Sequence, residues 1–204
     1  MKKSFILLLV TFIAFSCSKN ESTTATPPPD QLPAITTTGA NTAGCYINGK
    51  LLIPKNGEQA IGGPALYGLT TGAGINFHPP IIGDDYKYVS IQNLKDTGGS
   101  GIYIHFNEMT QGVGNYTVGQ SNGGYYISGP NNPQIIARTY DGTNTGKIFY
   151  SSPNSGTITV TRFDYPNGFY SGTFNCTLYN KDNPTEILQV TDGRFDIRIA
   201  TLNR

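Results

Sequence analysis

Charged side chains are scarce in this sequence: Asp, Glu, Lys and Arg make up only 13% of its 204 residues, and the formal net charge is +1. A nucleic-acid-binding face needs a concentration of basic residues, so this balance excludes DNA or RNA as an expected partner. Tryptophan is absent, which leaves Tyr and Phe as the rings available for stacking. With three cysteines, the chain is no disulfide-dense scaffold, and its length suffices to bury a core without such bonds.

Glycine and tyrosine are abundant instead, with 25 and 13 residues. From residue 42 onward, short stretches alternate apolar and polar residues, and turn signals recur about every 8–12 positions, as in β-sandwiches and barrels. No window keeps a helical period over three turns. The sequence therefore predicts an all-β domain over residues 42–204. We expect an antiparallel β-sandwich or flattened barrel of about a dozen short strands.

The N-terminal segment has the pattern of a bacterial lipoprotein leader. A basic start precedes the uncharged apolar run of residues 5–15, whose length suits a signal peptide and is too short for a membrane span. Residues 14–17 (AFSC) then resemble a lipobox, in which the signal is cut before a cysteine that becomes acylated. We expect a signal peptide over residues 1–16 and lipidation, including palmitate, at Cys17. The alternative is an ordinary secretory signal followed by an unmodified cysteine.

Residues 17–41 are rich in Thr and Pro and carry few large apolar side chains, so they predict a flexible tether. Acyl chains on Cys17 would hold the domain at the outer membrane, so the membrane is an expected partner. Residues 18–21 (SKNE) are similar to a surface-export signal and equally fit a solvated linker. The periplasmic and cell-surface faces of the outer membrane therefore both stay open.

Turn residues divide the domain into hairpins. Asn48 and Gly49 lie between two apolar runs, which is the strongest short-range hairpin signal. Asp192 and Gly193 are expected to turn the last hairpin, after which Phe195, Ile197 and Ile199 face inward. In that strand Arg194, Asp196 and Arg198 face outward. Separate strands are expected over residues 147–150, 156–163, 185–190 and 193–200.

Four segments carry a family resemblance: residues 44–50 (GCYINGK), 155–161 (SGTITVT), 171–174 (SGTF) and 191–196 (TDGRFD). Together they resemble a group of Bacteroidota lipoproteins with a domain of unknown function. Members of that group open with an NGK hairpin and end in an SGTF…TDGRFD motif. The resemblance implies an all-β envelope lipoprotein, and it implies no catalytic residues.

Cys45 and Cys176 remain once Cys17 is assigned to the lipid. Both fall on the inward-facing positions of their strands, and the envelope is an oxidising compartment. We expect a disulfide between them, which would stabilise the domain by about 4 kcal/mol in the chain-entropy model. The alternative is two separate buried thiols that act as small apolar residues.

No combination of residues predicts an active site. His78 and His105 lack the spacing of a zinc site, Asp84 and Asp85 fit a solvated turn, and residues 141–146 lack the acidic ligand that a calcium loop needs. We predict no catalytic residue, no metal site and no cofactor, and we expect that the protein is not an enzyme. A small hydrolase built from distant carboxylates or histidines stays as an alternative.

Aromatic residues are the remaining candidates for binding. An exposed aromatic face would suit glycans or an envelope protein, whereas the alternative is that Tyr serves cross-strand pairing. The predicted function is a lipid-anchored, non-catalytic binding or structural β-domain, with a glycan-binding accessory protein as the alternative. The candidate aromatic residues are Tyr86, Tyr88, Tyr103, Tyr125, Tyr126, Tyr140, Tyr165, Phe169 and Tyr170.

Overall fold

The computed structural model describes residues 30–73, 86–96, 99–107, 112–125, 132–140 and 146–204. Regular structure in these residues is almost entirely β-strand, which confirms the predicted all-β class. Within them, no helix has the length and apolar character needed to cross a membrane. The elements are β1 (Thr42–Ile47), β2 (Lys50–Leu52), β3 (Leu69–Ala73), β4 (Tyr86–Asn93), β5 (Ser100–Asn107), β6 (Gly114–Thr117), β7 (Gln134–Tyr140), β8 (Gly146–Asp164), β9 (Phe169–Asn180), β10 (Ile187–Arg198) and the short 3-10 helix η3 (Ile199–Thr201).

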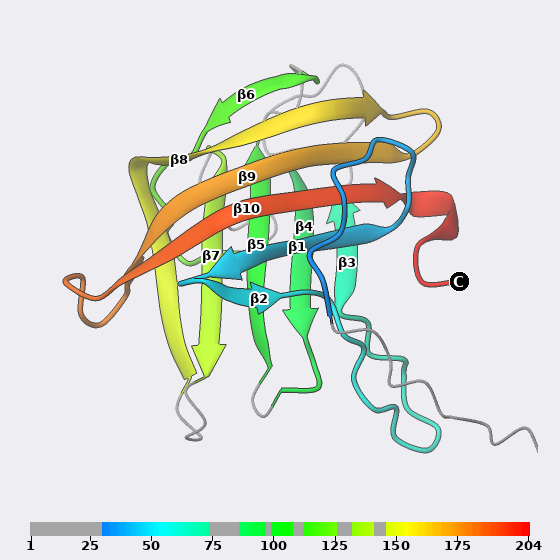
Figure 1. Cartoon of the computed structure of the whole chain (residues 1–204), viewed down its shortest axis with the longest axis horizontal. Coiled ribbons are helices and arrows are strands. Elements are labelled where there is room, and N and C mark those ends of the chain that lie inside the picture. The colour runs from blue at the N-terminus through cyan, green and yellow to red at the C-terminus, as the bar shows by residue number, and fades with distance from the viewer. Residues whose placement is uncertain (1–29, 74–85, 97–98, 108–111, 126–131, 141–145) are drawn as a thin grey trace, which may run out of the picture.

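The described strands form one antiparallel sheet that folds over on itself into two layers (Figure 1). Their order is β2-β1-β10-β9-β8-β7-β5-β4-β3, and β6 pairs with β8 beside this path. In Figure 1 the layer with β1, β9 and β10 runs across the view, and β3, β4, β5 and β7 cross it steeply from behind. This is the arrangement of orthogonally packed sheets, in which a bent strand passes from one layer to the other.

Strand β8 joins the two layers because it bends in its middle. Its first part pairs with β7 and its last part with β6. Between these parts, the register with β9 shifts between Ser151 and Gly156, and Asn154 has a left-handed φ of 58°. A bulge of this kind bends a strand without ending it. The two strands expected over residues 147–150 and 156–163 are therefore one strand.

The core fills the space between the layers. Alternate residues of each strand point into it, as the period of two requires. Phe195 and Ile197 are at most 2% exposed, which confirms their predicted inward positions, and Phe174 and Leu178 of β9 are equally buried. Ile199 is 43% exposed, because the chain leaves the sheet there and enters η3.

The two predicted Asx-Gly turns have different outcomes. Asn48 and Gly49 both have left-handed φ values, 47° and 76°, and connect β1 to β2 as expected. Asp192 and Gly193 do not turn the chain: residues 187–198 are one strand, whose register with β9 shifts between Val190 and Gly193. A Cβ on Gly193 would lie 2.5 Å from the Phe174 ring, so this bulge position requires glycine. The predicted hairpin is wrong because a bulge and a tight turn both use a left-handed residue.

The chain packs onto the sheet before residue 42. Residues 36–40, which we call the N-terminal strap, surround the carboxylate of Asp196 on β10 with hydrogen bonds from Thr36, Thr38, Gly39 and Ala40. The tether was expected to extend to residue 41, but its last part lies against β10 instead. Asp196 was expected to face outward, and it does lie opposite the core, yet the strap leaves it only 2% exposed.

Candidate functional site

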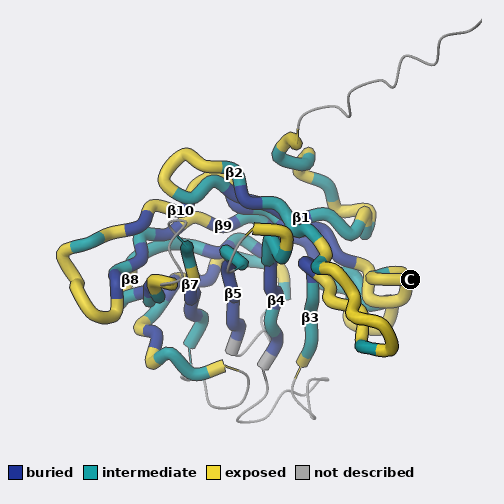
Figure 2. The backbone as a smooth tube through the Cα atoms, turned by 90° about the horizontal axis from the view of Figure 1, so that it is seen from below, coloured by how far each residue is buried: buried dark blue, intermediate teal, exposed yellow. Residues whose placement is uncertain are grey.

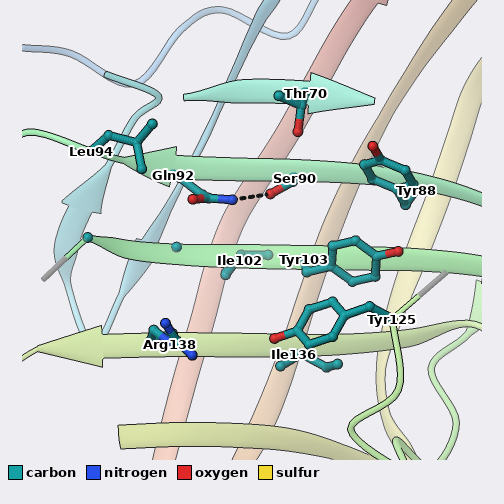
Figure 3. Close-up of a pocket in the computed structure, with 12 residues that line it drawn as sticks. Thr70, Tyr88, Ser90, Gln92, Leu94, Ile102, Tyr103, Tyr125, Ile136 and Arg138 are labelled. Carbon is teal, nitrogen blue, oxygen red and sulfur yellow. Dashed lines mark hydrogen bonds between the residues drawn. The ribbon is translucent and has the colours of Figure 1, made fainter. Parts of the chain in front are cut away.

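A pocket of about 470 Å³ lies on the face of β3, β4, β5 and β7 that points away from the core (Figure 3). Figure 2 shows β7, β5, β4 and β3 side by side, with mostly buried and half-buried residues along these strands and exposed residues in the surrounding loops. The described lining residues include aromatic rings, hydroxyls, one amide and one guanidinium, and none of them is acidic. They are Thr70, Tyr88, Ser90, Gln92, Leu94, Gly99, Gly101, Ile102, Tyr103, Tyr125, Ile136 and Arg138.

Strand register explains why these side chains meet. Val89 and Ile91 of β4 point into the core, so the residues that alternate with them point to the opposite face. The same alternation on β5 and β7 lines up residues directly across the strands. Two such rows cross the pocket, Ser90–Tyr103–Ile136 and Gln92–Gly101–Arg138.

Three tyrosines form one end of the pocket. The rings of Tyr88 and Tyr103 stack with centroids 5.2 Å apart, and Tyr125 meets Tyr103 edge-on at 4.8 Å. Gly72 lies beneath Tyr88, where a Cβ would come within 2.6 Å of the ring. Tyr103 is buried, whereas Tyr125 is 38% exposed. The end therefore presents a rigid aromatic wall with hydroxyl groups, an amphipathic surface suited to a ligand with apolar faces.

Tyr125 reaches the pocket from the segment after β6, and main-chain contacts hold that segment in place. The Ser121 N–H donates to the Ser151 carbonyl at 2.9 Å. The Gln134 amide, fully buried on β7, donates to the Gly124 carbonyl at 2.9 Å. A Cβ on Gly123 would collide with the Tyr150 hydroxyl, so the close approach needs glycine at that position.

The opposite end of the pocket is polar. The Gln92 amide donates to the Ser90 hydroxyl at 2.9 Å, shown as the dashed line in Figure 3. Between Gln92 and Arg138 lies Gly101, whose missing side chain leaves the floor open; a Cβ there would come within 2.8 Å of the Gln92 side chain. Arg138 is exposed, and among the described residues its guanidinium forms no ion pair or hydrogen bond. The guanidinium brings several N–H donors to this end of the pocket.

The structure brings three of the predicted aromatic residues together, Tyr88, Tyr103 and Tyr125. Tyr170 instead lies in the core, and Phe169 packs beneath the Arg162 guanidinium. The side chains of Tyr86 and Tyr126 lie outside the described part of the chain. The polar partners Ser90, Gln92 and Arg138 were not predicted, although their strand parity with Tyr88, Tyr103 and Ile136 was a usable signal.

The other candidate side chains form no chemical centre in the described part of the chain. His105 lies on the same face as Tyr103 with ring centroids 6.4 Å apart, and it is buried. His78, Asp84, Asp85 and residues 141–145 lie outside the described residues. Among the residues that are described, no group of three or more His, Cys, Asp or Glu could hold a metal ion.

Cys45 and Cys176 both face the core, as predicted, but they are free thiols. Strand β10 lies between β1 and β9, and second-neighbour strands are about 9–10 Å apart, beyond the reach of a disulfide. The predicted bond is therefore not formed. Burial raises the pKa of both thiols, that of Cys45 to about 12, so they stay protonated and unreactive. Cys17 lies outside the described residues, and its lipidation stays a prediction.

No protein-family model, curated protein or solved structure matches this chain.

Proposed function

We propose that the protein is a lipid-anchored, non-catalytic domain of the bacterial cell envelope whose pocket binds a saccharide. The observation that carries the proposal is the pocket itself, with stacked tyrosines at one end and amide, hydroxyl and guanidinium groups at the other. Its volume of about 470 Å³ lies in the range of small-molecule sites. A sugar ring has apolar faces and a rim of hydroxyls, so it matches both ends.

The anchoring part of the proposal rests on the sequence. The AFSC segment at residues 14–17 and the resemblance to Bacteroidota lipoproteins both favour acylation of Cys17. Two or three acyl chains give stable membrane attachment. We place the protein at the outer membrane and propose no particular face, and a purely structural role in the envelope is the alternative to saccharide binding.

Arg138 favours a saccharide that carries a carboxylate, such as a uronic acid. Its guanidinium borders the pocket without an ion pair among the described residues, and the described lining contains no acid that would repel an anion. A planar guanidinium binds a carboxylate through two parallel hydrogen bonds. Gln92 and Ser90 lie beside it and offer further polar groups to the hydroxyls of the same ring.

A glycan array followed by calorimetric titration tests the proposal. Saccharides with acidic sugars should bind, and Tyr125→Ala should weaken binding about tenfold or more, because it removes the exposed ring of the aromatic wall. Tyr165→Ala is the matched control, since Tyr165 has the same exposed fraction of 38% and does not line the pocket.

Arg138→Gln should abolish the preference for acidic over neutral sugars, and Arg138→Lys should retain part of that preference.

Two results would contradict the proposal. Absence of any glycan hit with the folded wild-type chain would remove the saccharide as the ligand. Equal losses for Tyr125→Ala and Tyr165→Ala would show that binding occurs away from the pocket.

A further inference from the structure

The connection between β2 and β3 carries a group of apolar side chains that the fold leaves in solvent. Ile61 is fully exposed, Leu66 is 48% exposed and Tyr67 is 37% exposed. Ala60, Pro64 and Ala65 are exposed as well. From Gln59 to Gly68 there is no charged residue. We call residues 56–68 the apolar loop; a soluble surface rarely exposes apolar side chains in such a contiguous group without a partner for them.

Hydrogen bonds give the apolar loop a defined shape. The Gly57 N–H donates to the Leu66 carbonyl at 3.0 Å, and the Gly63 N–H donates to the Ala60 carbonyl at 2.9 Å. At its base, Lys55 exchanges backbone hydrogen bonds of 3.0 Å with Gln92 and Leu94 of the β4 region. Figure 1 shows the loop projecting from the sheet at the lower right. The sheet thus presents Ile61 outward rather than letting it fold back on the core.

The described chain begins at the base of the same loop. Asp30 forms an ion pair with Lys55, the residue that precedes the loop. Asp30 follows Cys17 by thirteen residues, a length that spans at most about 45 Å when extended. If Cys17 carries the acyl chains, the bilayer lies within reach of the point from which the apolar loop projects.

We propose that the apolar loop is a second membrane contact, which inserts into the interfacial region of the bilayer that holds the acyl chains. Ile61 and Leu66 enter the boundary between headgroups and hydrocarbon, and Tyr67 lies at headgroup level, where tyrosine is favoured. The proposal goes beyond saccharide binding and shares with the proposed function only the lipid anchor. Two attachment points fix the orientation of the domain on the membrane, whereas a tether alone leaves it free to rotate.

The absence of tryptophan allows a direct test by a single fluorescent reporter. The full chain carrying Ile61→Trp is reconstituted into phosphatidylethanolamine–phosphatidylglycerol liposomes, with and without brominated acyl chains. We expect a blue-shifted emission and a loss of about half of the intensity in brominated liposomes, because the indole lies at the acyl boundary.

The matched control is Ile187→Trp. Ile187 is 47% exposed and lies near the β9–β10 connection, at the opposite end of the molecule from the apolar loop (Figure 1). The emission of this variant should not change.

The outcomes separate the loop from the anchor. Equal emission from Trp at positions 61 and 187 in liposome-bound protein overturns the membrane contact. Shielding of the Trp at position 61 by a co-purifying protein, instead of by lipid, overturns it as well. The same variants in a Cys17→Ala background test the anchor independently. Loss of liposome binding there supports lipidation, whereas unchanged flotation together with quenching at position 61 retains the loop and contradicts the anchor.

Discussion

Replacing Asp196 with alanine should lower the free energy of unfolding by about 3–5 kcal/mol, measured by urea denaturation at pH 7. The carboxylate lies on β10, opposite Thr42 of β1 and Ser171 of β9. It is 2% exposed, and no Lys or Arg of the described ranges pairs with it, so within that part of the chain hydrogen bonds compensate for its burial. The expected loss of stability is large because alanine would remove all of the hydrogen bonds that the carboxylate accepts.

Both carboxylate oxygens of Asp196 accept several hydrogen bonds. One accepts from the Thr36 hydroxyl at 2.6 Å and from the Thr38 and Ala40 N–H groups at 3.0 and 3.1 Å. The other accepts from the Gly39 N–H at 2.9 Å and the Ser171 hydroxyl at 2.6 Å. Three successive main-chain N–H groups around one anion form a nest. Alanine would leave the strap without its anchor, and asparagine would turn an NH₂ group toward donors.

The pH dependence of stability offers a second measurement at Asp196. Burial alone would raise the pKa of this carboxyl, but hydrogen bonds from Ser171, Thr36 and the strap amides lower it from 3.8 to about 2. The stabilisation is therefore complete above pH 4 and is lost as the pH falls toward 2, because the unfolded chain takes up the proton first. It amounts to about 2 kcal/mol. The Asp196→Ala variant should lack this part of the acid transition.

Asp192→Asn is the control, because Asp192 belongs to the same TDGRFD segment and its side chain is 62% exposed. Asparagine tolerates the left-handed φ of 53° at this position. We expect a change below about 0.5 kcal/mol. Similar losses for Asp192→Asn and Asp196→Ala would contradict an anchoring role for the Asp196 carboxylate.

Local patterns predicted the strands because alternation and turn chemistry act over a few residues. The Asn48–Gly49 hairpin and the inward positions of Phe195 and Ile197 needed no knowledge of distant contacts. The bend of β8 and the bulge at Asp192 were missed for a common reason. A left-handed residue fits a turn, a bend and a bulge equally, and the choice depends on whether the neighbouring strand continues past it.

The pocket could be predicted only in part. Tyr88, Tyr103 and Tyr125 stood out by residue type, but six other aromatic candidates looked the same in sequence. Tyr88 and Tyr103 meet because β4 pairs with β5, and Tyr125 joins them because the segment after β6 contacts β7 and β8. Both are long-range properties. Asp196 shows the same limit, since strand parity gave its face but not the strap that covers it.

Replacing Lys87 with methionine should stabilise the protein by about 2–4 kcal/mol at pH 6, measured by urea denaturation. Lys87 lies on β4 with its side chain on the core side, and it is 2% exposed. Its ammonium group is 3.9 Å from the centroid of the Tyr170 ring, and no carboxylate contacts it within the part of the chain that the structure describes. A cation–π contact offsets only about 2 kcal/mol of the cost of burying a charge.

The stabilisation by Lys87→Met should depend on pH in a defined direction. Burial lowers the pKa of Lys87 from 10.5 to about 7. Between these values the unfolded chain binds a proton that the folded protein has released, so the Lys87 contribution to stability rises with pH. Methionine removes that contribution. The gain should therefore be largest below pH 7 and shrink as the pH approaches 10.5.

Comparison of two variants isolates this effect from other titrations. The raised thiol pKa values of Cys45 and Cys176 lower stability above about pH 8.5, but they act equally in wild type and in Lys87→Met and cancel in the difference. Lys50→Met is the control, because Lys50 is an exposed lysine of β2 and its replacement should change stability by less than about 0.5 kcal/mol at every pH. Two results would contradict this expectation: Lys87→Met is less stable than wild type at pH 6, or its gain in stability stays constant from pH 6 to pH 10. Either result would mean that other interactions compensate for the cost of burying the ammonium charge. In that case Lys87 would be a stabilising part of the core rather than its main electrostatic cost.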